Sequence, residues 1–189
     1  MYEKLTNKLK AGFDPGRQAI EEVLACFSPA LTGRNQLLLS PGEVCKNYYF
    51  IETGALRVFT INKEGIENSR FFAFEGNFCT ALPSFINQEP AMEYLQSIEK
   101  SRLFSISRSS FFEMVEKHRF FSGIYLNILE TGFINAQKRI YGFQGFDAIE
   151  KVRWVIKSQP ELLLRVSNKM AASYLGISPS TLSRMKAKL

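Results

Sequence analysis

The spacing of glycines between positions 33 and 76 constrains the fold of this 189-residue chain more than any other feature. Glycines stand at positions 33, 42, 54, 65 and 76, with spacings of 9, 12, 11 and 11 residues. Segments rich in aromatic and β-branched residues lie between and after them, at residues 48–51, 56–61, 69–74, 95–98 and 103–106. Short strands at such regular spacing are typical of antiparallel sandwiches and barrels, so this region is predicted to be a β jelly roll, or double-stranded β-helix. Residues 62–65 (NKEG) are predicted to form a hairpin turn.

The apolar periodicity changes to that of helices at about Ser110. Residues 110–113 (SFFE) have the pattern of a capping box, and an apolar stripe at spacings of three and four then predicts a helix running to about Ile140. Residues 141–146 contain two glycines and are predicted to interrupt that helix as a hinge. A second capping box at residues 147–150 (DAIE) begins a helix that is expected to end before Pro160.

The last segment, residues 167–189 (SNKMAASYLGISPSTLSRMKAKL), predicts two short helices joined by a tight turn. Gly176 can adopt the left-handed conformation that ends a helix, and Ser178 can cap a second helix whose first turn contains Pro179. Ser180, Arg184 and Lys188 then align at i, i+4 and i+8 on one exposed face, as suits a helix that enters the major groove of DNA. A plain helical hairpin with a solvated face is the alternative interpretation.

The charge of the chain is concentrated at the same end. The net charge is +6, but residues 138–189 carry ten Lys and Arg against three Asp and Glu, whereas residues 1–137 carry fourteen against fifteen. This step favours a polyanion-binding end on a neutral body, although a solvated basic surface would also account for it. Together with the helical pair, it predicts binding to double-stranded DNA.

Over almost its whole length the sequence resembles the CRP/FNR superfamily of bacterial transcription regulators. Residues 39–43 (LSPGE), 49–54 (YFIETG) and 75–78 (EGNF) resemble the jelly-roll turns of that family, and residues 175–184 (LGISPSTLSR) resemble its turn and recognition helix. The resemblance implies an α+β protein of two domains: a jelly-roll sensor with flanking helices (1–117), a dimerisation helix (118–141) and a winged helix-turn-helix (142–189). The chain stops at Leu189, directly after the predicted recognition helix, so the wing is expected to be missing.

The sequence departs from the family at the cassette that binds the cyclic phosphate in the classical cyclic-AMP receptor. An ungapped comparison from Gly76 puts Thr80 and Ala81 where the family has Gly-Glu, and Ala91 and Met92 where it has Arg-Ser. Without that guanidinium an anionic phosphate lacks a strong charge partner, so cyclic AMP is predicted not to bind. No cofactor is expected, and the effector, if there is one, is another small molecule. Its pocket is predicted at the cassette. Phenylalanines are frequent there, so an apolar ligand is one alternative, but these phenylalanines are expected to be core residues instead. The predicted pocket residues are Phe78, Thr80, Ala81, Ala91 and Met92.

The resemblance also implies roles in DNA binding and dimerisation. Arg184 matches a base-reading position of the family, and Ser180 is a secondary base reader. Other residues are expected to contact phosphates because they match the family's phosphate contacts or add charge: Ser167, Lys169, Ser178, Thr181, Lys186 and Lys188. The expected partners are a second copy of the chain and RNA polymerase. The dimer contacts are predicted at Phe121, Tyr125, Ile128 and Gly132.

Several other classes of protein are disfavoured by composition. No apolar stretch approaches the ~20 residues of a membrane span, and the start of the chain lacks the pattern of a secretion signal, so a cytoplasmic protein is expected. His118 is the only histidine and is expected to face solvent, which leaves too few ligands for a cupin-type metal site. The three cysteines are scattered, and no catalytic triad or phosphate loop is present, so the chain is predicted not to be an enzyme. A ligand-binding or interaction module that has lost specific DNA binding is the alternative function.

Overall fold

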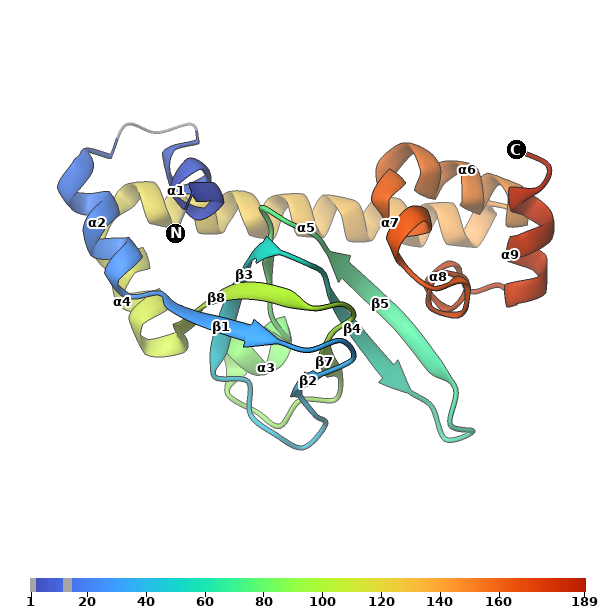
Figure 1. Cartoon of the computed structure of the whole chain (residues 1–189), viewed down its shortest axis with the longest axis horizontal. Helices are drawn as coiled ribbons and strands as arrows, with labels where there is room; N and C mark the ends of the chain where they lie inside the picture. Colours follow the sequence, from blue (N-terminus) through green and yellow to red (C-terminus); the bar gives the residue numbers. More distant parts are fainter. Residues whose placement is uncertain (1–2, 12–14) are drawn as a thin grey trace. The chain divides into compact units, whose positions relative to one another are not determined.

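Two four-stranded sheets form the β part of the protein, as the computed structural model of residues 3–11 and 15–189 describes it (Figure 1). The strand order is β1-β8-β3-β6 in one sheet and β2-β7-β4-β5 in the other. Each of the five predicted strand segments overlaps an observed strand, so these predictions are confirmed. The strands are β1 (Ser28–Thr32), β2 (Leu37–Leu39), β3 (Asn47–Thr53), β4 (Leu56–Ile61), β5 (Glu67–Ala73), β6 (Phe78–Cys79), β7 (Tyr94–Ser97) and β8 (Ser101–Ser107).

The predicted turn between β4 and β5 is also confirmed. Gly65 has a φ of 76°, a conformation that a residue with a side chain rarely adopts, and its amide donates to the carbonyl of Asn62 at 3.0 Å. The side-chain oxygen of Asn62 accepts from the amides of Glu64 and Ile66 at 3.1 and 2.8 Å. The turn therefore satisfies its own backbone groups.

The chain divides into two compact units, each made of two separate stretches. One unit contains Met1–Val58 and Ala73–Glu130, and the other contains Phe59–Phe72 and Thr131–Leu189. The hairpin of β4 and β5 is thus grouped largely with the C-terminal helices. The units are called the N-terminal unit and the C-terminal unit below.

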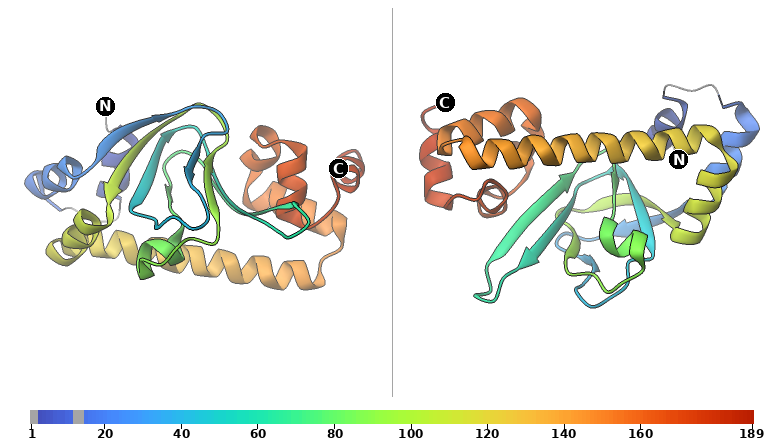
Figure 2. Two further views of the ribbon diagram at one scale, coloured as in Figure 1. Left: turned by 90° about the horizontal axis from the view of Figure 1, so that it is seen from below. Right: turned by 180° about the vertical axis from the view of Figure 1, so that it is seen from behind.

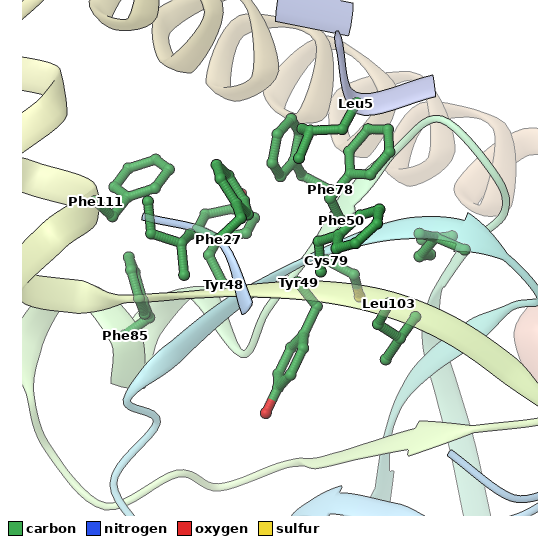
Figure 3. Close-up of a cluster of buried hydrophobic side chains, with 14 of the residues drawn as sticks. Leu5, Phe27, Tyr48, Tyr49, Phe50, Phe78, Cys79, Phe85, Leu103 and Phe111 are labelled. Carbon is green, nitrogen blue, oxygen red and sulfur yellow. The ribbon is translucent and has the colours of Figure 1, made fainter. Parts of the chain in front are cut away.

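The core of the N-terminal unit is rich in aromatic side chains. Tyr48 stacks on Phe111 with ring centroids 5.1 Å apart, and Phe85 meets both rings edge-on at 5.2 and 5.7 Å (Figure 3). Phe78 contacts Phe50 edge-on at 5.0 Å. Most phenylalanines near the predicted effector pocket are core residues, as expected, because Phe78 and Phe85 are 5% and 0% exposed.

Among its described residues, four short helices accompany the strands of this unit: α1 (Glu3–Lys10), α2 (Arg17–Ala25), α3 (Leu82–Asn87) and α4 (Arg108–Lys117). The start of α4 corrects the predicted capping box. The cap is Ser107, the last residue of β8, whose side chain accepts from the amide of Ser110 at 3.1 Å, so the helix begins three residues earlier than the box at 110–113 implies. An extended Ser107 ends the strand and caps the helix at once.

The long helix α5 (Arg119–Gly145) corrects the predicted hinge. It continues through Tyr141 and Gly142, where an interruption was expected. A glycine within a helix costs only about 1 kcal/mol, and contacts in the C-terminal unit stabilise the extension. The Phe143 ring lies edge-on to Trp154 at 5.9 Å and to Tyr174 at 6.4 Å.

His118, at the junction of α4 and α5, also differs from expectation. Its side chain is only 12% exposed, and its Nε2 lies 3.1 Å from a carboxylate oxygen of Glu22 in α2. The ring therefore packs at a helix junction instead of facing solvent. The neighbouring basic residues suggested an exposed position, but they could not reveal a partner 96 residues away.

The C-terminal unit contains four short helices around the end of α5 (Figure 2). The helix after the second capping box begins where predicted: Asp147 accepts from the amides of Ile149 and Glu150 at 2.9 Å, and Glu150 accepts from the amide of Asp147 at 2.8 Å. It also ends before Pro160, as expected. The helices are α6 (Ala148–Ser158), α7 (Pro160–Arg165), α8 (Asn168–Leu175) and α9 (Pro179–Lys186).

Candidate nucleic-acid interface

The first helix of the C-terminal pair, α8, is built on an apolar face. Ser167 caps it by accepting from the amide of Met170 at 3.3 Å. Its buried side chains, Ala171, Ala172, Tyr174 and Leu175, are all 3% exposed or less. Two adjacent alanines let neighbouring elements approach closely, so this helix serves as the support for the next one.

The turn after α8 has the predicted geometry. Gly176 has φ 64° and ψ 36°, the left-handed conformation that ends helices, and its amide donates to the carbonyl of Ala172. The amide of Ile177 donates to the same carbonyl at 3.1 Å. A residue with a Cβ would be strained here, so the chain reverses between the two helices at little cost.

The second helix, α9, begins with a network of hydroxyl groups. Ser178 accepts from the amide of Thr181 at 3.0 Å and donates to the Thr181 hydroxyl at 2.8 Å. The Ser180 hydroxyl lies 2.9 Å from that of Ser178. A guanidinium nitrogen of Arg184 lies 3.4 Å from the Thr181 hydroxyl, so Arg184 leans toward the start of α9.

One polar side chain fixes the angle between the two helices. The side-chain amide of Asn168, the first residue of α8, donates through Nδ2 to the carbonyl of Pro179 at 2.9 Å and to the hydroxyl of Ser183 at 3.1 Å. Leu182, on the inner face of α9, is fully buried. The sequence analysis missed Asn168, because an asparagine next to a capping serine carries no sign of a contact 11 residues away.

Most of the predicted DNA contacts are accessible. Ser167, Lys169, Ser178, Ser180 and Arg184 are exposed, whereas Thr181 and Lys186 are half-buried. The hydroxyls of Ser167 and Ser178 also act as helix caps. Ser167 and Ser178 therefore lie at the starts of α8 and α9, where amide groups and the helix dipole favour anions.

Lys188 departs from the predicted stripe on α9. The helix ends at Lys186, and the amide of Lys188 donates to Met185 three residues back, at 3.1 Å. The chain thus tightens at the end of the helix, and Lys188 lies beyond its regular turns. Arg153 and Lys157 on α6 are further exposed cations that the sequence analysis did not single out.

The predicted effector residues do not form one exposed patch. Phe78, Thr80, Ala81 and Ala91 are between 0% and 8% exposed, whereas Met92 is 88% exposed. The Thr80 hydroxyl donates to the carbonyl of Asn47 at 2.9 Å. None of the five lines the hollow of about 560 Å³ that the structure shows beside α1 and α2, whose walls include Thr6, Ile20 and Leu24.

The predicted dimer residues are divided between core and surface. Phe121 is 1% exposed and lies edge-on to Phe111 at 5.3 Å, so its side chain is not available to a second copy, which corrects that prediction. Tyr125 and Ile128 are half-buried against the same core, and Gly132 is exposed. The sequence could not predict this division, because a broad apolar stripe on a helix does not show which of its edges packs against the chain's own core.

The exposed apolar residues of α5 are different from the predicted dimer contacts and lie one or more positions away from them in the sequence. Leu126, Phe133 and Ile140 are 56%, 65% and 48% exposed and recur every seven residues. Ile134 and Tyr141, which are 50% and 69% exposed, follow the same spacing one position later. These five residues are called the α5 stripe below.

Across residues 3–11 and 15–189, no helix is long and apolar enough to cross a bilayer. In the same ranges no three His, Cys, Asp or Glu residues come together in a way that could hold a metal ion.

Comparison with known proteins identifies the fold. Residues 33–118 match the family model of the cyclic nucleotide-binding domain, and no curated protein is significantly similar in sequence. The solved structure of FixK2 from Bradyrhizobium japonicum is similar, with 15% identity, a TM-score of 0.74 and coverage of 86% of this chain and 84% of that one.

Two further solved structures are similar over most of both chains. A transcriptional regulator of the crp/fnr family from Eubacterium rectale has 12% identity, a TM-score of 0.73 and coverage of 96% and 87%. CLP of Xanthomonas campestris, described as a c-di-GMP responsive global regulator, has 18% identity, a TM-score of 0.71 and coverage of 90% of each chain. Residues 33–118 thus match the cyclic nucleotide-binding domain, and the chain shares its fold with these solved regulators, in agreement with the resemblance that the sequence shows.

Proposed function

We propose that this chain is a transcription regulator that binds double-stranded DNA sequence-specifically as a homodimer. The observation that carries the proposal is α9, a capped helix with Arg184 and Ser180 exposed, in the most cationic quarter of the chain. A helix of this kind, preceded by a supporting helix and a tight turn, fits the major groove. The fold shared with solved regulators supports the same conclusion.

Within this proposal, α8 supports the fold and α9 reads the bases. Arg184 is the main base reader, because a guanidinium can donate two hydrogen bonds to one guanine. Ser180 is the second reader. Lys169 and Lys186 bind phosphates together with the capped helix starts, and these contacts position the protein without reading sequence.

The α5 stripe provides the surface for the second copy. Exposed aromatic and aliphatic side chains at a seven-residue spacing form the kind of seam by which two helices associate. A two-fold dimer would present two α9 helices to half-sites about 34 Å apart on the DNA.

The chemistry of the predicted pocket residues argues against a cyclic nucleotide as the effector. Thr80 is bonded to the backbone, Ala81 and Ala91 are buried without a polar side-chain atom, and Met92 is apolar. None of these residues offers a cation to a cyclic phosphate. We therefore propose that cyclic AMP is not the effector and that another small molecule takes this role.

The proposal is tested by fluorescence anisotropy with the duplex upstream of the protein's own gene and a shuffled duplex of the same composition. Both titrations are run at two salt concentrations. The expected result is a preference for the upstream duplex that persists at the higher salt, because base contacts depend on salt less than phosphate contacts do. Failure to bind either duplex at low salt would instead support an interaction module without DNA binding.

A further inference from the structure

The guanidinium of Arg139 in α5 bonds to the main chain of two segments that are far away in sequence. Nη1 donates to the carbonyl of Arg70, and Nη2 donates to that of Ser69 at 3.3 Å, both in β5. Nη2 also donates to the carbonyl of Tyr174 at 3.1 Å, near the end of α8. All of these residues belong to the C-terminal unit.

This half-buried side chain lies against aromatic rings. The guanidinium carbon lies 4.2 Å from the ring centre of Tyr174 and 5.0 Å from that of Phe143. Phe72 of β5 lies edge-on to Tyr174 at 5.6 Å, and both rings are 3% exposed. Burial lowers the pKa of Arg139 below its usual value, but an arginine stays charged at neutral pH. Hydrogen bonds from a charged donor such as this guanidinium are stronger than those between neutral groups.

At the C-terminal end of α8, the carbonyl of Tyr174 needs a hydrogen-bond donor from outside the helix. The last four carbonyls of a helix have no partner within the helix, and the dipole makes this end negative. The turn amides of Gly176 and Ile177 both donate to Ala172, not to Tyr174. Arg139 supplies both the donor and the positive charge that the carbonyl of Tyr174 favours.

A second set of contacts joins the same two segments. The hydroxyls of Ser69 in β5 and Ser173 in α8 are 2.6 Å apart, and the amide of Ser69 donates to the Ser173 hydroxyl at 3.3 Å. Ser69 also donates to the carbonyl of Met170 at 3.2 Å, and Ser69 is only 2% exposed. Strand β5 and helix α8 are therefore held in one register by side chains as well as by Arg139.

We propose that Arg139 is a positioning residue that couples the orientation of α9 to the conformation of β5. It holds the end of α8, which leads through the Gly176 turn directly into α9, and it holds two consecutive carbonyls of β5. A change in β5 is thereby transmitted to the helix that reads DNA. This inference rests on the proposed function, because α9 is taken as the recognition helix.

The chain supplies a matched control next to Arg139. Lys138 is exposed on the same helix and has the same formal charge. Lys138→Met therefore removes the charge without these contacts, whereas Arg139→Met removes both. Arg139→Lys keeps the charge but loses the planar fork that reaches carbonyls of two segments at once.

The first measurement is hydrogen exchange on the full-length wild type and the three variants. In Arg139→Met, amides of β5 and of α8 are expected to exchange at least about tenfold faster, because local opening becomes easier in both segments. Lys138→Met should behave as wild type. Unchanged exchange, or a change in only one segment, would overturn the proposal, and so would full rescue by Arg139→Lys, since charge alone would then suffice.

The second measurement is the ratio of affinities for the upstream and shuffled duplexes. Arg139→Met is expected to lower this ratio about tenfold. Its affinity for the shuffled duplex should equal that of Lys138→Met, because phosphate contacts tolerate a misplaced helix better than base contacts do. An unchanged ratio in Arg139→Met contradicts the inference. If the wild type itself shows no preference, the proposed function fails, while the exchange measurement still decides the coupling.

Discussion

Arg184 is the residue on which sequence recognition depends most in this proposal. Its guanidinium is exposed, and a contact with Thr181 draws it toward the start of α9. Thr181 is in turn bonded to the capping residue Ser178. The residue expected to read bases is thus oriented by residues that the sequence predicted as phosphate contacts.

Replacing Arg184 with alanine should weaken binding to the preferred duplex by about 1–3 kcal/mol, the value of a bidentate contact with guanine. Binding to a shuffled duplex should fall much less. Lys169→Ala is the control, because loss of a phosphate contact should weaken binding to both duplexes alike. Anisotropy titrations measure both effects, and an Arg184→Ala variant that keeps the wild-type preference would remove Arg184 from its assigned role.

Cyclic AMP should leave the melting temperature of the protein unchanged at micromolar concentrations. A ligand that binds only the folded state raises stability in proportion to the logarithm of its concentration over Kd. The residues at the predicted cassette offer no cation for the phosphate, so no such rise is expected. A dose-dependent rise in a thermal-shift titration would contradict this prediction, and Arg57, fully buried in β4, would become the residue to examine.

At the scale of the elements, α5 shows what periodicity can and cannot predict. Its apolar spacing predicted a helix, and the helix is present. The same spacing could not assign Phe121 to the core or Phe133 to the surface, because both lie within one broad stripe. Two glycines near the end suggested a break, but packing of Phe143 against Trp154 outweighs the small local cost of glycine.

Placing a charge in the α5 stripe should separate the proposed dimer. Phe133→Glu buries a carboxylate in the apolar seam, which is strongly unfavourable without a partner. Sedimentation velocity should show the wild type at twice the 21.6 kDa of one chain and the variant at that mass. Asn135→Glu adds the same charge at another exposed position of the helix and should remain dimeric. A wild type that sediments as a monomer would exclude the seam.

The cap of α6 should contribute measurably to stability. Asp147→Ala removes a side chain that accepts two amide hydrogen bonds and is expected to cost about 1 kcal/mol of unfolding free energy. Asp147→Asn is the control, because asparagine caps helices about as well. Denaturant unfolding followed by circular dichroism provides the measurement. Equal losses in both variants would show that the charge of Asp147, not the cap, is what matters.

Sequence patterns predicted local structure well and contacts between distant segments poorly. The hairpin turn at Gly65, the cap at Asp147 and the stop at Gly176 depend on neighbouring residues, and all three have the predicted form. The partners of Arg139 and Asn168 could not be predicted, because their contacts are with the main chain, which leaves no trace in residue type. Lys138 and Arg139 look alike in the sequence, and only the fold distinguishes them.

At the scale of the whole molecule, the segregation of charge predicts a strong dependence of DNA binding on salt. If Lys169, Lys186 and Lys188 each neutralise a phosphate in both copies, the logarithm of affinity should fall with that of salt with a slope of about −5. The Phe133→Glu monomer should show about half that slope. A slope near zero for the shuffled duplex would mean that these lysines do not contact phosphates.

The grouping of residues 59–72 with the C-terminal helices has a consequence for how such a protein can be divided. Because each unit is assembled from two separate stretches, no single cut yields two intact pieces. A fragment beginning at residue 131 would leave behind Phe72 and Ser69, and with them the neighbours of Tyr174 and Ser173. A graft of the C-terminal unit onto another protein must therefore include this hairpin, so residues 59–72 and 131–189 have to be exchanged together.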